Sequence, residues 1–230
     1  GGTYTQFDVT LRRMGIDVTF VDIHDPSAIE AAITQRTKAV YAETIGNPRA
    51  DVLDFESVSN VAHAHGLPLI VDNTFATPYL CRPLEHGADI ITHSATKFIG
   101  GHGAVIAGCI VESGEFPWDN GNFPLLTDPS PAYHDLQFWE NFREYAYLMK
   151  ARTELLRDTG ASLSPFNSFL LLLGLETLPL RMRQHVANAK TVAEFLNDHP
   201  KVAWVGYPIF DDNESTEKAK RYLPEGPGAV

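Results

Sequence analysis

Short apolar runs alternate with helical patterns through the first 111 residues, and this alternation constrains the fold more than any other feature of the chain. The runs occupy residues 18–21, 38–43, 67–71, 89–92 and 105–111. Some of them are apolar throughout, which is typical of strands buried on both faces. Strands that alternate with helices predict an α/β fold with a mainly parallel central sheet. The pattern leaves the direction of the last run open.

Local signals indicate where the intervening helices begin and end. Asp25 directly before Pro26 predicts an N-cap with proline at the first helical position. Asp54 predicts the cap of a second helix. A short helix is expected over residues 79–86, ending at Gly87.

The second half of the chain has a different pattern. Residues 112–135 are polar and interrupted by prolines, so an ordered loop is expected there. Helices are expected from about residue 136 onward. The sequence predicts one long helix over residues 175–197, bent at Pro179, and a strand over residues 201–205.

This change of pattern suggests two domains. We expect residues 1–172 to form a large domain and residues 173–230 to form the first part of a smaller C-terminal α+β domain. Both are expected to be incomplete, since the chain opens with Gly-Gly-Thr-Tyr and ends without a terminal helix.

Composition excludes several classes of function. The formal net charge of −11 disfavours nucleic acid as a partner, because a polyanion requires a basic face. No apolar stretch approaches about 18 residues and no signal peptide is present, so neither a membrane protein nor a secreted one is indicated. Cys81 and Cys109 do not form a CxxC motif. A cytoplasmic location is therefore predicted.

Polar residues follow three of the predicted strands at the points where they end. These residues are Glu43 and Asn47 after the second run, Asp72 after the third, and Ser94, Thr96 and Lys97 after the fourth. Open parallel sheets bind ligands at the carboxyl ends of their strands. Asp72 and Lys97 are separated by one strand–helix–strand crossover, which predicts that they lie at neighbouring strand ends.

These residue types match what pyridoxal 5′-phosphate (PLP) requires. PLP needs a lysine amine for a Schiff base and a carboxylate that keeps its pyridine nitrogen protonated. Lys97 can supply the first and Asp72 the second. The hydroxyls of Ser94 and Thr96 can bind a phosphate dianion. Glycines after the lysine would allow the backbone to approach the cofactor closely.

Other interpretations were weighed for the same residues. Asp72 alone could be a helix cap, and Lys97 alone could be a solvated loop residue. A Schiff-base aldolase that uses Lys97 without PLP would leave the aspartate and both hydroxyls unexplained. No metal site is predicted, because the helical pair His63 and His65 lacks the i,i+4 spacing of zinc ligands, and no third ligand accompanies His93 and His102.

Three stretches carry a resemblance to a known family: residues 71–79 (VDNTFATPY), residues 87–90 (GADI) and residues 93–103 (HSATKFIGGHG). They resemble the Cys/Met-metabolism family of PLP enzymes, which is cystathionine γ-synthase-like. The resemblance extends over essentially the whole chain and implies the aspartate aminotransferase type I fold. Within the family the chain is most similar to the O-acetylhomoserine sulfhydrylases, on residues 43–48 (ETIGNP), the opening GGTY and the proline-rich insert.

The resemblance implies a role for each candidate residue. Lys97 would carry PLP and act as the catalytic base, and Asp72 would pair with the ring nitrogen. Ser94 and Thr96 would bind the phosphate. Asn47 would lie near the 3′-oxygen of the ring, and Glu43 would be a nearby structural or substrate-orienting acid.

The resemblance also implies an activity, which is γ-replacement of O-acetyl-L-homoserine with sulfide to give L-homocysteine and acetate. The alternatives are cystathionine γ-synthase and a cystathionine or methionine lyase, and Ile45-Gly46 departs from the pair found in many of the lyases. A homodimer or homotetramer with shared active sites is implied. Since other elements of the family's site find no match here, we expect the isolated chain to be a folded fragment that is inactive without other chains.

Overall fold

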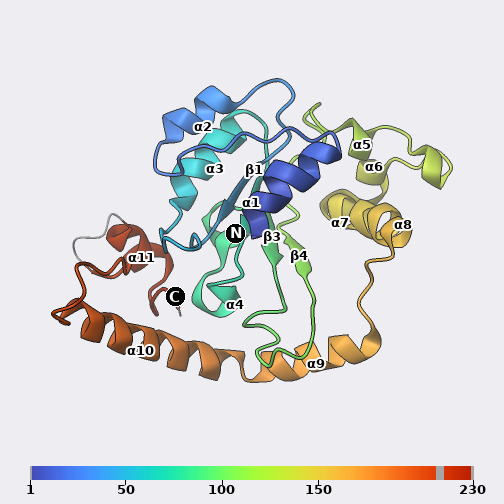
Figure 1. Ribbon diagram of the computed structural model, residues 1–230. Coiled ribbons are helices and arrows are strands. Elements are labelled where there is room, and N and C mark those ends of the chain that lie inside the picture. The colour runs from blue at the N-terminus through green and yellow to red at the C-terminus, as the bar shows by residue number, and fades with distance from the viewer. Residues whose placement is uncertain (1, 211–214, 229–230) are drawn as a thin grey trace.

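The computed structural model describes residues 2–210 and 215–228. Within them, one sheet has the strand order β1–β2–β3–β4 (Figure 1). Its strands are β1 Val40–Glu43, β2 Leu69–Asp72, β3 Ile90–His93 and β4 Cys109–Glu112. β1, β2 and β3 are parallel, and β4 runs antiparallel to β3. The mainly parallel sheet predicted from the sequence is confirmed, and the open direction of the last run is settled.

Short helices precede β1 or connect the three parallel strands. They are α1 Gly2–Thr5, α2 Pro26–Ala32, α3 Phe55–Ala64 and α4 Thr77–Leu80, with the π-helix η1 Gln6–Leu11 and the 3₁₀ helix η2 Pro83–His86. Both predicted caps are confirmed. Asp25 Oδ1 accepts a hydrogen bond from the Ser27 N–H at 2.9 Å, and Asp54 Oδ1 accepts one from the Ser57 N–H at 3.3 Å. These side chains satisfy amides that the first helical turn leaves without backbone partners.

Helices of the second half lie at the right of the molecule and along its lower edge, and the last of them, α11, lies at the left (Figure 1). They are α5 Pro124–Thr127, α6 Phe138–Phe142, α7 Ala146–Lys150, α8 Arg157–Thr159, α9 Pro165–Glu176, α10 Leu178–Asn197 and α11 Thr216–Tyr222, with η3 Pro131–Tyr133, η4 Arg143–Tyr145 and the π-helix η5 Ala151–Leu156. No described helix combines the length and apolar character needed to cross a membrane. The segment 112–135, expected to be an ordered loop, contains two of these short helices, α5 and η3.

Two apolar clusters pack against the sheet. The larger one joins β1 and β2 to α3 and also includes Met182 of α10 and Tyr222 of α11. Tyr222 packs edge-on against Phe55 with ring centroids 4.9 Å apart. The second cluster places Ile90 of β3 against aromatic residues such as Phe116 and Trp118. Residues from the far end of the chain thus complete the core that supports the first two strands.

Four predicted elements differ from the structure. Residues 18–21 and 201–205 form no strand, since neither segment pairs with another strand among the described residues. Phe20 and Trp204 within them are exposed. The helix expected over 79–86 is split into α4 and η2 because Pro83 lacks an N–H donor and restricts the residue before it. Its predicted end is correct, as Gly87 adopts a left-handed conformation with φ of 95°.

The helix expected over residues 175–197 is also two helices. α9 already begins at Pro165, after Ser164 caps it through the Asn167 N–H at 3.1 Å. It ends at Glu176, and α10 restarts at Leu178 with Pro179 in its first turn. A proline in the first turn is tolerated because its missing N–H would have no helical partner there. The break therefore lies before the proline rather than at it.

Candidate active site

Polar side chains from β1, β2 and β3 share one face of the sheet near its carboxyl end. Tyr41 and Glu43 pair in register with Ile70 and Asp72 of β2, and Asp72 pairs with Thr92 of β3. Residues paired across neighbouring strands point to the same face. The structure thus brings Glu43 and Asp72 together, as expected, and adds the side chains of Tyr41 and Thr92.

Asp72 is held by two hydrogen bonds. Its Oδ1 accepts from the backbone N–H of Thr74 at 2.8 Å. Its Oδ2 accepts from the phenol of Tyr41 at 3.4 Å. Burial raises the pKa of Tyr41, and the negative charges of Asp72 and Glu43 raise it further. Tyr41 therefore keeps its proton and remains a donor to the carboxylate at neutral pH.

Glu43 is half-buried beside this pair. Its Oε2 accepts from the backbone N–H of Asn47 at 3.3 Å. Burial is the main cause that raises the pKa of the Glu43 carboxyl, and the negative charge of Asp72 adds to the effect. Asn47 is exposed, and the hydrogen bond that joins it to Glu43 uses its backbone rather than its side chain.

The segment after β3 carries the remaining candidates. The Ser94 N–H donates to Thr74 Oγ1 at 2.8 Å, which joins this segment to the end of β2. The Thr96 N–H and hydroxyl both donate to the Ala107 carbonyl at 3.1 Å, and the Ala107 N–H donates to the same hydroxyl at 2.9 Å. Thr96 thus closes the loop of residues 97–106 at its base.

Lys97 begins this loop with an exposed side chain. Its backbone is fixed, because its N–H donates to the Ser94 carbonyl at 3.0 Å and its carbonyl accepts from the Gly101 N–H at 2.8 Å. Its amine forms no hydrogen bond or ion pair with residues 2–210 or 215–228. The amine is therefore available for a covalent bond to an aldehyde.

Two buried residues beside Asp72 were not predicted as part of the site. Asn73 is fully buried and accepts a hydrogen bond from the Thr44 hydroxyl at 2.7 Å. His93 is buried, and its Nδ1 finds no hydrogen-bond partner in the described part of the chain. Burial lowers the pKa of His93 against the opposing effect of the Asp72 charge, so its imidazole is neutral at neutral pH. The strand period of two could have identified Tyr41, since it precedes Glu43 by two residues.

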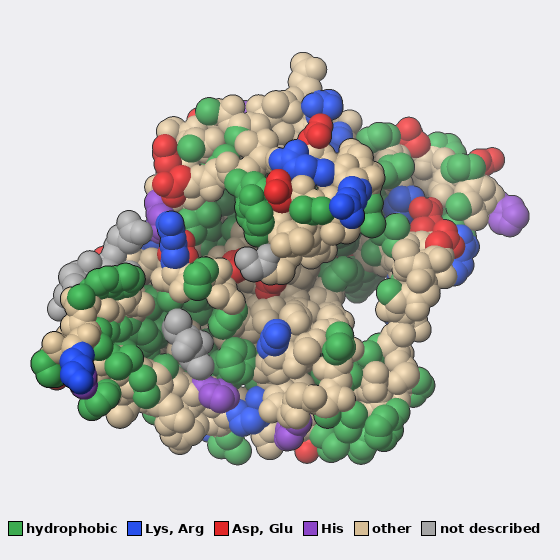
Figure 2. All heavy atoms as spheres, in the orientation of Figure 1, with side chains coloured by type: hydrophobic (Ala, Val, Ile, Leu, Met, Phe, Trp, Pro, Cys, Tyr) green, Lys and Arg blue, Asp and Glu red, His purple; other side chains and the backbone are tan. Residues whose placement is uncertain are grey.

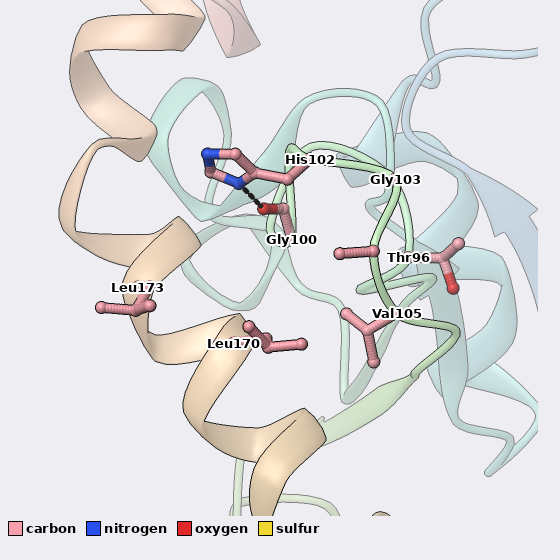
Figure 3. Close-up of a pocket in the computed structure, with 8 residues that line it drawn as sticks. Thr96, Gly100, His102, Gly103, Val105, Leu170 and Leu173 are labelled. Carbon is pink, nitrogen blue, oxygen red and sulfur yellow. Dashed lines mark hydrogen bonds between the residues drawn. The ribbon is translucent and has the colours of Figure 1, made fainter.

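A cavity of about 220 Å³ lies between the loop after Lys97 and α9 (Figure 3). Leu170 and Leu173 of α9 line one side, and the glycine-rich stretch and Thr96 line the other. His102 Nδ1 is 2.7 Å from the Gly100 carbonyl. Because a carbonyl can only accept, Nδ1 carries the proton. The cavity lining is largely apolar.

The outer side of α9 is also apolar. Figure 2 shows hydrophobic side chains gathered at the lower right, where α9 lies. Its exposed large residues include Phe166, Phe169 and Leu172. Charged side chains of both signs are scattered over the rest of this face (Figure 2). Among the described residues, no group of three or more metal-ligating side chains is found.

The family model of the Cys/Met metabolism PLP-dependent enzymes matches residues 1–230 of this sequence. The chain belongs to this family. The resemblance inferred from the lysine motif is thereby confirmed, and so is PLP as the cofactor of the family.

Curated members of the Cys/Met metabolism family are similar over the whole chain. The homocysteine synthase of Schizosaccharomyces pombe is 54% identical, covering 100% of this chain and 54% of that protein. The O-acetyl-L-homoserine sulfhydrylase of Leptospira meyeri is 49% identical, covering 98% of this chain and 53% of that protein. The chain therefore spans about half the length of the curated relatives it matches.

Solved structures of the family share the fold. A crystal structure of a putative O-acetylhomoserine (thiol)-lyase from Campylobacter jejuni has a TM-score of 0.94 and 36% identity, covering 99% of this chain and 55% of that one. It contains N′-pyridoxyl-lysine-5′-monophosphate. Cystathionine γ-lyase from Lactobacillus plantarum, complexed with L-serine, has a TM-score of 0.78 and 37% identity, covering 99% and 51%. The predicted fold class is confirmed.

The side chains at the strand ends fit PLP chemically. An ordered carboxylate, a half-buried serine and a lysine amine that has no partner among the described residues lie at neighbouring strand ends, which matches the groups that PLP requires. Thr96 fits less directly, because its hydroxyl is already bonded to Ala107. Asn47 is placed near Glu43, and no hydrogen bond joins its side chain to Asp72 or Lys97 within the described residues.

Proposed function

We propose that the protein is a PLP-dependent O-acetylhomoserine sulfhydrylase, which converts O-acetyl-L-homoserine and sulfide to L-homocysteine and acetate. The observation that carries this proposal is the pair of relatives, 54% and 49% identical across this chain, named homocysteine synthase and O-acetyl-L-homoserine sulfhydrylase. The available amine of Lys97 and the ordered carboxylate of Asp72, which follow neighbouring strands, supply the chemistry that such a reaction needs.

In this proposal the residues divide the work of binding PLP. Lys97 holds it covalently, and Asp72 accepts a hydrogen bond from the ring nitrogen, with its own orientation fixed by Thr74 and Tyr41. Ser94 and Thr96 bind the phosphate through hydroxyls and nearby amides. Asn47 lies toward the 3′-oxygen, and Glu43 orients the substrate.

PLP, when bound, supplies an electron sink that makes protons next to the substrate amine acidic. Lys97 then acts as a base, and its amine takes up a proton from the substrate Cα and later returns one. For that role the amine must present a free electron pair to the substrate.

Comparison of three reactions tests the proposal. The protein, together with any other chains that complete its site, is supplied with PLP and with O-acetyl-L-homoserine plus sulfide, L-cystathionine, or L-methionine, and the products are quantified. We expect homocysteine formation from the first mixture to exceed cleavage of the other two. A preference for cystathionine would instead assign the protein to the lyases of the family, and a colourless protein that retains no PLP would identify a non-catalytic folded module.

Further predictions from the sequence accompany this proposal. We propose residues 1–172 as the cofactor-binding large domain and residues 173–230 as the first part of the smaller one. A homodimer or homotetramer and a cytoplasmic location also stay predictions. Light scattering measures the oligomeric state, and microscopy of a tagged protein measures the location.

A further inference from the structure

Arg181 on α10 reaches across to the loop that Lys97 begins. Its Nη1 donates to the Phe98 carbonyl at 2.7 Å, and its Nη2 lies 3.5 Å from the Ile99 carbonyl. The same Nη2 donates to the Gly174 carbonyl of α9 at 2.6 Å. One guanidinium thus connects the two residues directly after Lys97 to the end of α9.

The contact is held from the helix side as well. Nε of Arg181 donates to the Thr177 hydroxyl at 3.1 Å, at the junction between α9 and α10. No carboxylate forms an ion pair with Arg181 among residues 2–210 and 215–228. Desolvation lowers the pKa of the guanidinium from its usual value. Backbone carbonyl dipoles, rather than an acidic side chain, therefore compensate its charge.

Two glycines show how closely the loop and the helices approach. Gly101 has a φ of +71°, and a Cβ atom there would lie 2.5 Å from Arg181 Nη1. A Cβ atom on Gly174 would lie 2.4 Å from the carbonyl oxygens of both Ile99 and Gly100. Figure 3 shows Gly100 opposite α9. Neither position has room for a larger residue, so the backbone contact is specific.

We propose that Arg181 is a positioning residue for Lys97: by holding the carbonyls of Phe98 and Ile99, it fixes the turn from which the lysine side chain projects. The proposal rests on the proposed function of Lys97. Lys97 and Gly101 are joined by their own hydrogen bond, so the main chain of residues 97–101 is a single turn. Arg181 holds that turn from outside and ties it to α9 and α10.

The test compares Arg181→Met, Arg181→Lys and a matched control, Arg183→Met. Arg183 lies on the same helix, is exposed and forms no hydrogen bond or ion pair with the described residues. Amide hydrogen exchange of residues 97–101 is measured without PLP. With PLP added, the pH midpoint of its visible absorption reports on the ionisation of the lysine–cofactor bond.

We expect exchange in residues 97–101 to rise roughly 10- to 100-fold in Arg181→Met, which is the effect of losing hydrogen bonds from a charged donor. The pH midpoint should shift in that variant and stay at the wild-type value in Arg183→Met. Arg181→Lys should lie between, because an ammonium can replace only part of the planar fork. It also provides the comparison if Arg181→Met does not fold.

The proposal would be overturned if a folded Arg181 variant showed the same amide exchange rates in residues 97–101 as wild type and also the same pH midpoint. A loss of thermal stability with neither of these two changes would also overturn it, since Arg181 would then be structural only. Exchange without PLP does not depend on any reaction. A protein that shows the exchange effect but no sulfhydrylase activity would therefore contradict the proposed function alone.

Discussion

Replacing Asn73 with alanine should destabilise the protein strongly. Asn73 follows Asp72 and is fully buried. Its Oδ1 accepts from the Thr44 hydroxyl at 2.7 Å, and its Nδ2 donates to the carbonyls of Thr77 at 3.1 Å and Cys81 at 2.9 Å. Asn73→Ala removes all three hydrogen bonds and leaves the Thr44 hydroxyl and the Cys81 carbonyl without a partner among the described residues.

The magnitude follows from two groups, because the Thr77 carbonyl still accepts from the Cys81 N–H at 3.3 Å. A buried polar group left without a partner costs about 1–3 kcal/mol, so the free energy of unfolding should fall by at least about 2 kcal/mol. With a slope of roughly 2 kcal/mol per molar urea, the unfolding midpoint should fall by about 1 M. Asn73→Asp should also be destabilising, because its second oxygen would face the carbonyls of Thr77 and Cys81.

Urea unfolding followed by far-ultraviolet circular dichroism measures this effect. Asn197→Ala is the matched control, since Asn197 is exposed at the end of α10 and its side chain bonds to nothing in the described part of the chain. That variant should stay within about 0.5 kcal/mol of wild type. A loss below about 1 kcal/mol in Asn73→Ala would refute the reasoning, as it would show that the buried partners find other bonds.

Three further changes test the site. Lys97→Ala should abolish covalent PLP attachment and turnover while leaving the urea midpoint nearly unchanged, because the side chain is exposed; a yellow covalent adduct in this variant would contradict the assignment. Asp72→Ala should slow turnover by roughly 10²-fold, since it would remove the carboxylate that we propose pairs with the ring nitrogen of PLP, and Asp72→Glu should be milder; near-normal rates would make Asp72 only a turn-forming residue. The third change concerns Glu43, whose carboxyl pKa is raised in the folded state, mainly by burial. The folded protein then keeps a proton that the unfolded chain loses, so this stabilisation is complete below the unfolded pKa and is lost as pH rises through the folded pKa. Unfolding midpoints from about pH 4.5 upward should therefore fall less steeply in Glu43→Gln than in wild type or in the exposed control Glu176→Gln, and an equal slope would count against a raised pKa.

The sequence was sufficient for the central part of the fold. Apolar runs with polar residues at their ends located β1, β2 and β3, and the crossover between Asp72 and Lys97 correctly predicted neighbouring strand ends. These features depend on local periodicity and on the regular connectivity of parallel strands. The roles of the six candidate residues stay predictions, and the variants described above test those of Lys97 and Asp72.

Other features could not be predicted because they depend on contacts between distant segments. The break between α9 and α10 lies where Gly174 meets the loop after Lys97, and no pattern near residue 174 shows that contact. Residues 18–21 have the composition of a strand, but a strand exists only where a partner offers its backbone. Tyr41 carries no local signal of a role at the site, and its bond to Asp72 becomes visible only from the strand register.

The bonds between Thr96 and Ala107 give residues 97–106 the character of an Ω-loop, whose two ends meet at one point. The pairs that set the register of β3 with β4, such as His93 with Cys109, lie outside this loop, so the register does not depend on the length of the loop. Residues inserted at the exposed tip near Gly103 would then add mainly loop entropy, about 0.6 kcal/mol for a doubling of length. Changes in length should therefore be tolerated at the tip in laboratory insertion libraries, while a single added residue between His93 and Thr96 would displace the lysine from its strand end.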